Sequence, residues 1–137
     1  MGTVRSMMLL LSIVPGLLLG GCQKVTSSDL VGRWTNPDGA NLILKADGTF
    51  SAQALPAQVF LMHDSIDAPI TGTGQWQFEE HNLLWYGNAG KLQLHFDEIS
   101  GRPVPRTGMS VIVSGDGSLY QWKGEEGGER YELVKRK

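Results

Sequence analysis

Turn signals divide this chain into short apolar runs, and that division limits its fold more than any other feature. From Leu30 onward, glycines, prolines and three Asp-Gly pairs (Asp38-Gly39, Asp47-Gly48 and Asp116-Gly117) interrupt the sequence at the spacing of an antiparallel meander. Each Asp-Gly pair suits a tight hairpin whose central residues need positive φ. No long stretch has the 3.6-residue apolar period of a helix. The sequence therefore predicts an all-β fold.

Nine runs between the turn signals suit strands. In one of them, Leu92, Leu94 and Phe96 alternate with polar residues, which predicts an inward apolar face and an outward polar face. The same alternation predicts that Ala54 faces inward at the end of the third run. The expected strands cover residues 31–36, 40–46, 49–54, 72–80, 83–87, 91–97, 108–114, 118–123 and 129–135.

One short segment suits a helix instead. Residues 56–62 allow one or two helical turns, with Pro56 at an early position where its missing N–H is tolerated. Because no linker or composition shift follows, we expect one antiparallel β domain over residues 30–137. Exposed sheet edges invite unwanted pairing, so about eight short strands are expected to form a small barrel or a sandwich that hides them.

The first 21 residues have the three parts of a cleaved signal peptide. Arg5 supplies the positive charge, an apolar stretch runs from Met7 to Leu19, and small residues precede Cys22. The apolar stretch is shorter than the roughly 20 residues that a membrane-spanning helix needs. The ending Leu19-Gly20-Gly21-Cys22 resembles the lipobox of bacterial lipoproteins, and this resemblance implies that the Cys22 sulfur carries a lipid.

The lipobox resemblance also implies a location. Residues 22–29 would be the lipidated cysteine and a polar tether, which anchors the domain to the membrane of the bacterial cell envelope. Gln23 stands where an Asp usually retains such proteins in the inner membrane, which favours the periplasmic side of the outer membrane in a Gram-negative cell. The alternatives are an ordinary signal peptide, or a transmembrane helix with an incidental thiol.

Charge and cysteine content exclude several classes of protein. Lys and Arg number 12 against 14 Asp and Glu, a formal net charge of -2, so the chain lacks the basic excess typical of a nucleic-acid binder. The chain has one Cys, which rules out an internal disulfide and a multi-cysteine metal site.

Two resemblances concern the β domain. Gly32-Arg33-Trp34 resembles the opening of the first strand in lipocalin-like barrels, which implies that Trp34 closes the barrel base under an arginine from near the end of the chain. Arg130 is the expected arginine, through a cation–π contact. A longer set of segments resembles small bacterial lipoproteins of unknown function: residues 30–36, 42–50, 55–57, 72–76, 119–124 and 130–133.

Few residues suggest catalysis. His63, Asp64 and Asp67 could supply ligands to a divalent metal, or an acid and a base, but a solvated loop is the expected interpretation because no recognised ligand spacing is present. We therefore expect no catalytic residues, no metal and no cofactor, and the chain is not expected to be an enzyme.

The aromatic residues say more about binding. Tyr120 and Trp122 lie two apart, so on a strand they share one face, and an exposed aromatic there would mark a partner surface. The alternative is an aromatic-rich core. The loop over 100–107 is expected to project Arg102 and Arg106 on stiff, proline-containing backbone, with an ordinary exposed connection as the alternative.

These observations predict a non-enzymatic envelope lipoprotein whose domain binds another protein, in the manner of an inhibitor or an immunity protein. The alternative is a lipocalin-like binder of a small apolar ligand, which would need a cavity inside the barrel rather than a filled core.

Overall fold

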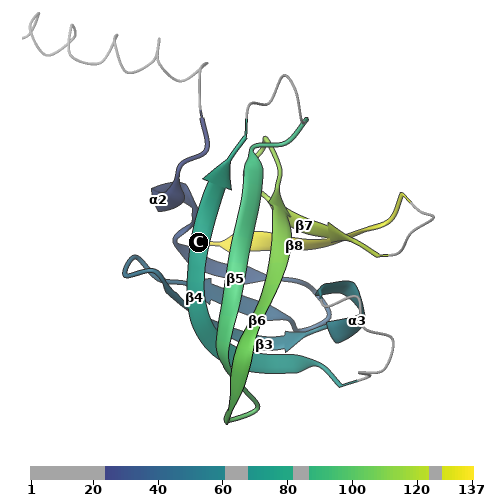
Figure 1. Cartoon of the computed structure of the whole chain (residues 1–137). Coiled ribbons are helices and arrows are strands. Elements are labelled where there is room, and N and C mark those ends of the chain that lie inside the picture. Colours follow the sequence, from purple (N-terminus) through teal and green to yellow (C-terminus); the bar gives the residue numbers. More distant parts are fainter. Residues whose placement is uncertain (1–23, 61–67, 82–86, 124–127) are drawn as a thin grey trace, which may run out of the picture.

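A computed structural model describes residues 24–60, 68–81, 87–123 and 128–137, without the side chains of Gln58, Pro105 and Arg106 (Figure 1). The expected signal peptide, the Cys22 lipidation site and the His63 group lie outside these residues. So does the strand expected over 83–87, apart from its last residue.

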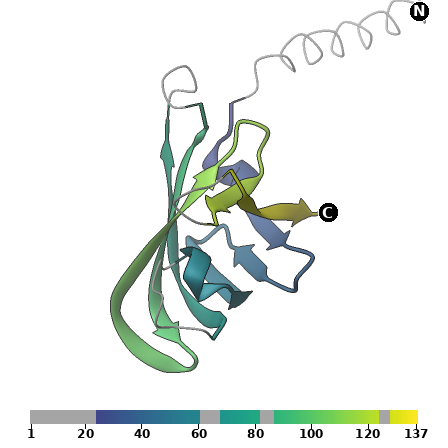
Figure 2. The same cartoon turned by 90° about the vertical axis from the view of Figure 1, so that its right-hand side faces the viewer.

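The described strands close into one antiparallel barrel. Each strand pairs with the next along the chain, and the last strand, β8, pairs back with the first, β1, so the sheet has no open first or last strand. Figure 2 shows the long strands β4 to β6 curving as one layer beside the shorter ones. The strands are β1 (Gly32–Thr35), β2 (Asn41–Leu44), β3 (Thr49–Leu55), β4 (Ile70–Glu80), β5 (Gly90–Ile99), β6 (Arg102–Val113), β7 (Leu119–Trp122) and β8 (Arg130–Arg136).

The three Asp-Gly pairs all form hairpins, with one correction to the expected backbone. In the β2–β3 turn, Lys45 N–H donates to the Thr49 carbonyl, Gly48 N–H donates to the Lys45 carbonyl, and Thr49 N–H donates to the Asp47 carboxylate. The turns at Gly39 and Gly117 repeat this pattern. Only the glycine of each pair has positive φ. The aspartate acts instead as a side-chain acceptor that holds the turn.

The barrel interior is filled with apolar side chains. Leu92, Leu94 and Phe96 are buried, which confirms the alternation expected in β5. The prediction for Ala54 is wrong, because the β3–β4 register shifts between Ala52 and Leu55, Ala54 takes a φ of 56°, and Leu55 enters the core in its place. Such a bulge moves every following side chain to the other face of the sheet.

Two helical turns pack against the barrel. The turn α3 (Ala57–Phe60) lies within the expected helix, and its Phe60 ring meets the Tyr131 ring edge-on at 5.7 Å between centroids. The turn α2 (Ser27–Leu30) was not expected, since the sequence suggested a polar tether there. Its capping box, formed by Thr26 and Asp29, starts the helix, and Leu30 at its end is fully buried.

The expected loop over 100–107 is mostly strand. The chain turns at Ser100 and Gly101, both with positive φ, and β6 begins at Arg102. Prolines usually exclude a segment from a sheet, which is why the sequence suggested a loop. They are tolerated on a strand edge that has no partner, and the pairing of β6 with β7 covers only Ile112 and Val113.

Candidate binding surfaces

Trp34 is a structural residue in the barrel wall. It is 1% exposed, and its indole Nε1 donates a 2.8 Å hydrogen bond to the Leu30 carbonyl at the end of α2. The expected cation–π partner is wrong. The cation nearest its ring is Lys135, with Nζ 6.0 Å from the ring centroid, because the β1–β8 register sets Lys135 opposite Trp34. Lys135 also donates to the Asp29 carbonyl, which ties β8 to α2.

Arg130 belongs instead to an outward cluster with Tyr120 and Trp122, which we call the aromatic patch. The β7–β8 register sets Trp122 opposite Arg130. The Arg130 guanidinium carbon lies 4.3 Å from the Tyr120 ring centroid and 5.1 Å from that of Trp122, and the two rings meet edge-on at 5.5 Å. These contacts hold a long, flexible cation in one place on the surface.

In the part of the chain that the structure describes, the aromatic patch presents apolar surface to solvent. Trp122 is 40% exposed, whereas Tyr120 beneath it is 7% exposed. Within the described residues, neither the Trp122 indole N–H nor the Arg130 guanidinium has a hydrogen-bond partner, although the Arg130 charge acts on the Asp116 carboxylate. The sequence therefore identified both aromatic residues of this patch and their shared face, but paired Arg130 with the wrong tryptophan.

The second group of predicted binding residues lies elsewhere. Arg102 is exposed at the start of β6, beside the turn at Ser100 and Gly101. Figure 1 shows that the β5–β6 hairpin ends at the bottom of the molecule, well away from β7 and β8. Arg102 therefore does not join the aromatic patch, and the side chain of Arg106 lies outside the described residues.

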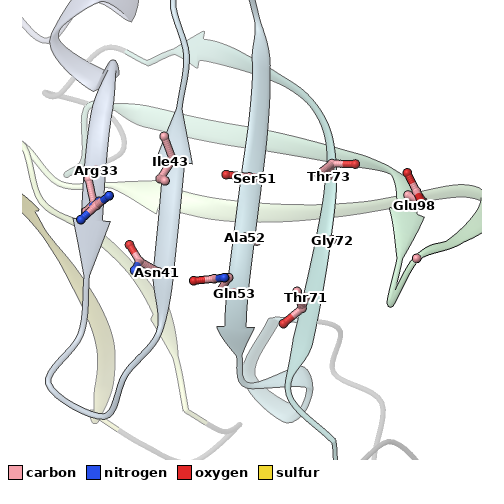
Figure 3. Close-up of a pocket in the computed structure, with 11 residues that line it drawn as sticks. Arg33, Asn41, Ile43, Ser51, Ala52, Gln53, Thr71, Gly72, Thr73 and Glu98 are labelled. Atoms are coloured by element: carbon pink, nitrogen blue, oxygen red, sulfur yellow. The ribbon is translucent and has the colours of Figure 1, made fainter.

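A hollow of about 550 Å³ lies on the outer side of the sheet over β1 to β4, and sequence reasoning did not find it. Figure 3 shows its labelled side chains on four neighbouring strands, with Glu98 of β5 at the far edge. Uncharged polar side chains and apolar groups, among them Ile43 and Ala52, line its middle, and charges stand at its two ends. Its lining includes Arg33, Asn41, Ile43, Ser51, Gln53, Thr71, Thr73 and Glu98.

The titratable groups with shifted pKa values serve the fold. Burial, followed by the hydrogen bond to Asp38, raises the pKa of the Tyr131 hydroxyl, which donates to both Asp38 oxygens at 2.7 and 2.9 Å. Hydrogen bonds from Thr49 lower the pKa of Asp47 in its turn, and hydrogen bonds from Ser114 and Ser118 lower that of Asp116. These groups hold hairpins together. Asp47 also lines an open hollow that His95 and Asp97 share, and Asp116 lines another that Asp29 and Lys135 share.

Two searches of the described residues bear on other classes of site. They contain no group of three His, Cys, Asp or Glu side chains placed to hold a metal ion. In the same part of the chain, no helix has both the length and the apolar character needed to cross a membrane.

The fold and its surfaces define a small, closed, antiparallel β-barrel with a filled interior and an exposed aromatic patch. Comparisons with known proteins add no relative. No protein-family model matches the chain, and no match was found among curated proteins or among solved structures.

Proposed function

We propose that this chain is a lipid-anchored protein of the bacterial cell envelope whose barrel binds another protein without catalysis. The observation that carries the binding part is the aromatic patch. Exposed tryptophan and arginine are the residue types that most often dominate the energy of protein interfaces, and here each holds the other in place.

The patch is suited to a protein partner by its free polar groups as well as by its apolar area. No described residue accepts a hydrogen bond from the Trp122 indole N–H or from the five N–H donors of Arg130. A partner that brings carbonyl or carboxylate oxygens would satisfy them while it covers the indole ring. Because the two aromatic rings already order Arg130, binding would lose little side-chain entropy.

The lipocalin-like alternative receives less support. It needs room for an apolar ligand inside the barrel, and the described interior holds large side chains instead, among them Trp34, Phe50 and Phe96. The hollow over β1 to β4 lies on the outer side of the sheet and not inside the barrel.

A crosslinking pull-down of the full chain from the membranes of its native cell, read by mass spectrometry, tests the binding. We expect one stoichiometric protein partner that is lost with Trp122→Ala and with Arg130→Ala. Val134→Ala is the matched control, because Val134 is also an exposed apolar residue, at 55% exposure, but lies outside the patch. A partner that survives both patch changes, or a co-purifying apolar small molecule in place of a protein, would contradict the proposal.

The lipid anchor has its own test. Cys22→Ser should release the protein from the membrane or leave an unprocessed precursor, because the serine hydroxyl cannot form the thioether to the lipid. Mass spectrometry of the membrane fraction measures this directly. A variant that still fractionates as a mature, lipidated protein would rule out lipidation at Cys22.

A further inference from the structure

Two arginines stand directly opposite each other on the outer side of the barrel. The β1–β8 register pairs Arg33 with Arg136, and both side chains lie on the face opposite to buried Trp34. Like charges opposite each other on neighbouring strands repel, since their Cβ atoms are only about 5 Å apart. This arrangement weakens the seam that closes the barrel.

The described structure does not neutralise this pair. Within the described residues, neither arginine side chain has an ion-pair or hydrogen-bond partner. Other exposed charges in the molecule do find partners, such as Lys24, which lies 2.6 Å from Glu80. Two uncompensated guanidinium groups on one seam make a site that an external anion would stabilise, because each can donate two parallel hydrogen bonds to a carboxylate or a phosphate.

The surface next to this pair combines apolar area with hydroxyl and amide groups. Arg33 stands at one end of the hollow over β1 to β4, directly opposite Ile43. The polar side chains of the lining are Asn41, Ser51, Gln53, Thr71 and Thr73, and apolar area between them suits the carbon-bound faces of a sugar ring (Figure 3). Hydroxyl and amide side chains both donate and accept hydrogen bonds, so they match the vicinal hydroxyls of a sugar. The volume of about 550 Å³ lies within the usual range of small-molecule sites.

Asn41 connects the arginine pair to the hollow. It lines the hollow on the Arg33 side and also a second hollow of about 540 Å³ that has Arg136 in its wall. Its side-chain oxygen Oδ1 is buried and has no hydrogen-bond partner. A buried acceptor without a donor destabilises the folded state, so a ligand hydroxyl that meets this oxygen after the Asn41 side chain turns toward the hollow would remove a penalty as well as add a contact.

We propose that this outer face binds an anionic saccharide, a sugar that carries a carboxylate or phosphate, through Arg33 and Arg136 at one end and the hollow at the other. Glu98 sets the direction of binding. It lies four strand spacings from Arg33 in the register, about 19 Å along the sheet, where it accepts hydroxyl hydrogens and repels the acidic group. The acidic group therefore lies at the β1–β8 seam.

The first test uses the full chain on an array of carboxylated, phosphorylated and neutral oligosaccharides. We expect retention of acidic members and not of their neutral counterparts, with retention falling as salt is raised. Arg33→Gln should weaken binding of the retained sugar by about tenfold to a hundredfold, since a charge-assisted bidentate contact is lost. Lys91→Gln is the matched control, because it removes one exposed positive charge from β5, outside the hollow.

A second variant separates function from folding. Arg33→Glu places a carboxylate opposite Arg136, so it should abolish saccharide binding and at the same time raise the melting temperature by roughly 1 to 5 °C. A variant that loses binding while it gains stability has not lost binding through misfolding. The proposal fails if no acidic sugar is retained, if neutral sugars are retained equally, or if Arg33→Glu leaves binding unchanged.

A separate arm of the same experiment distinguishes a free saccharide from the headgroup of a glycolipid. A free trigalacturonate probe and phosphatidylcholine vesicles that carry a sialylated ganglioside present the acid without and with a lipid. Binding to the free probe assigns a soluble or polymeric saccharide, and binding to the vesicles alone assigns a glycolipid headgroup. Both results support the proposal, and binding to neither, with no acidic sugar retained on the array, overturns it.

Discussion

Trp34 and Trp122 each have a cation beside the indole ring, but only Trp34 is buried. Each ring lies near a cation supplied by β8, which is Lys135 for Trp34 and Arg130 for Trp122. Trp34 is almost fully buried, and its indole N–H is bonded to the Leu30 carbonyl, whereas Trp122 is 40% exposed, with no described acceptor for its N–H. The difference lies in the side of the sheet on which each ring stands, because Trp34 belongs to the core, where the Leu30 carbonyl accepts its N–H, and Trp122 is on the outward face. Nothing in the described structure covers the Trp122 ring.

This contrast indicates how one strand can serve both folding and binding. On the inward side of β8, aromatic and aliphatic residues gain the free energy of burial and have their polar tips satisfied. On its outward side, the same kinds of contact order a surface without covering it. Substitutions at the buried Trp34 site and at the exposed aromatic patch test this division between folding and binding.

The largest effect is expected at the buried Trp34 site. Trp34→Ala should lower the free energy of unfolding by about 3 to 5 kcal/mol, because it leaves a cavity and removes the hydrogen bond to Leu30. Urea denaturation of the full chain measures the loss. Partner binding per folded molecule should be unchanged, and a loss of stability no larger than that of Trp122→Ala would remove the distinction between the two sites.

Gly74 opens a second Gly-x-Trp segment, Gly74-Gln75-Trp76, and tests how closely β4 and β5 must approach each other. Trp76 donates from Nε1 to the Lys45 carbonyl at 2.9 Å, and a Cβ on nearby Gly74 would overlap the carbonyl oxygen of His95. Gly74→Ala should therefore cost about 1 to 3 kcal/mol of unfolding free energy, since a strand has to shift. Gly108→Ala is the control, because its Cβ would stand 3.4 Å from the movable His95 ring. Equal losses would show that the close strand approach at Gly74 is unimportant.

Tyr131 is the inward counterpart of Arg130 on β8. Tyr131→Phe should lower the free energy of unfolding by about 1.5 kcal/mol, because its hydroxyl bonds the Asp38 carboxylate from within the barrel wall. The pKa of the hydroxyl is raised in the folded state above its ordinary 10.0. Its stabilisation is therefore complete below pH 10.0 and is lost as the pH rises above that value, where the unfolded chain ionises first.

The pH dependence is checked by measuring the melting temperatures of the native chain and Tyr131→Phe from neutral to strongly alkaline conditions. The difference between the two should shrink only on the alkaline side. A difference that stays constant through that range would mean that the Tyr131 hydroxyl contributes nothing through its ionisation.

The smallest effect on stability is expected at the aromatic patch. Trp122→Ala should lower the free energy of unfolding by only about 0.5 to 1 kcal/mol, the range of an exposed cation–π contact, although it removes the proposed partner contact. The same urea titration measures it. A loss of unfolding free energy as large as that of Trp34→Ala would mean that the aromatic patch stabilises the fold as much as the buried site does, which would contradict its assignment as a binding surface.

Much of the fold could be predicted from local patterns. The alternation of Leu92, Leu94 and Phe96 reports which face of β5 is buried, because successive side chains of a strand point to opposite sides. The Asp-Gly pairs marked three hairpins for an equally local reason. The local patterns failed where the structure departs from regular alternation, at the bulge beside Ala54 and at the unpaired edge that admits Pro103.

The candidate site was only half predictable for a related reason. The spacing of Tyr120 and Trp122 placed both on one face. The facing of two residues on the same strand depends only on how far apart they are in sequence, so no other part of the chain is needed to predict it. The cation beside each tryptophan, and the meeting of Arg33 with Arg136, depend on the register of β8 against β7 and β1. A shift of one residue in that register would exchange every one of these pairs.

Local sequence patterns thus predict most of the strands, the three Asp-Gly turns and most inward residues, because these properties follow from the alternation and turn chemistry of neighbouring residues. The closure of the sheet into a barrel, the hydrogen bond from Trp34 to the Leu30 carbonyl and the hollow beside two opposed arginines depend on the tertiary structure. These features join opposite ends of the chain, and the free energy that sets the β1–β8 register comes from packing the whole core at once.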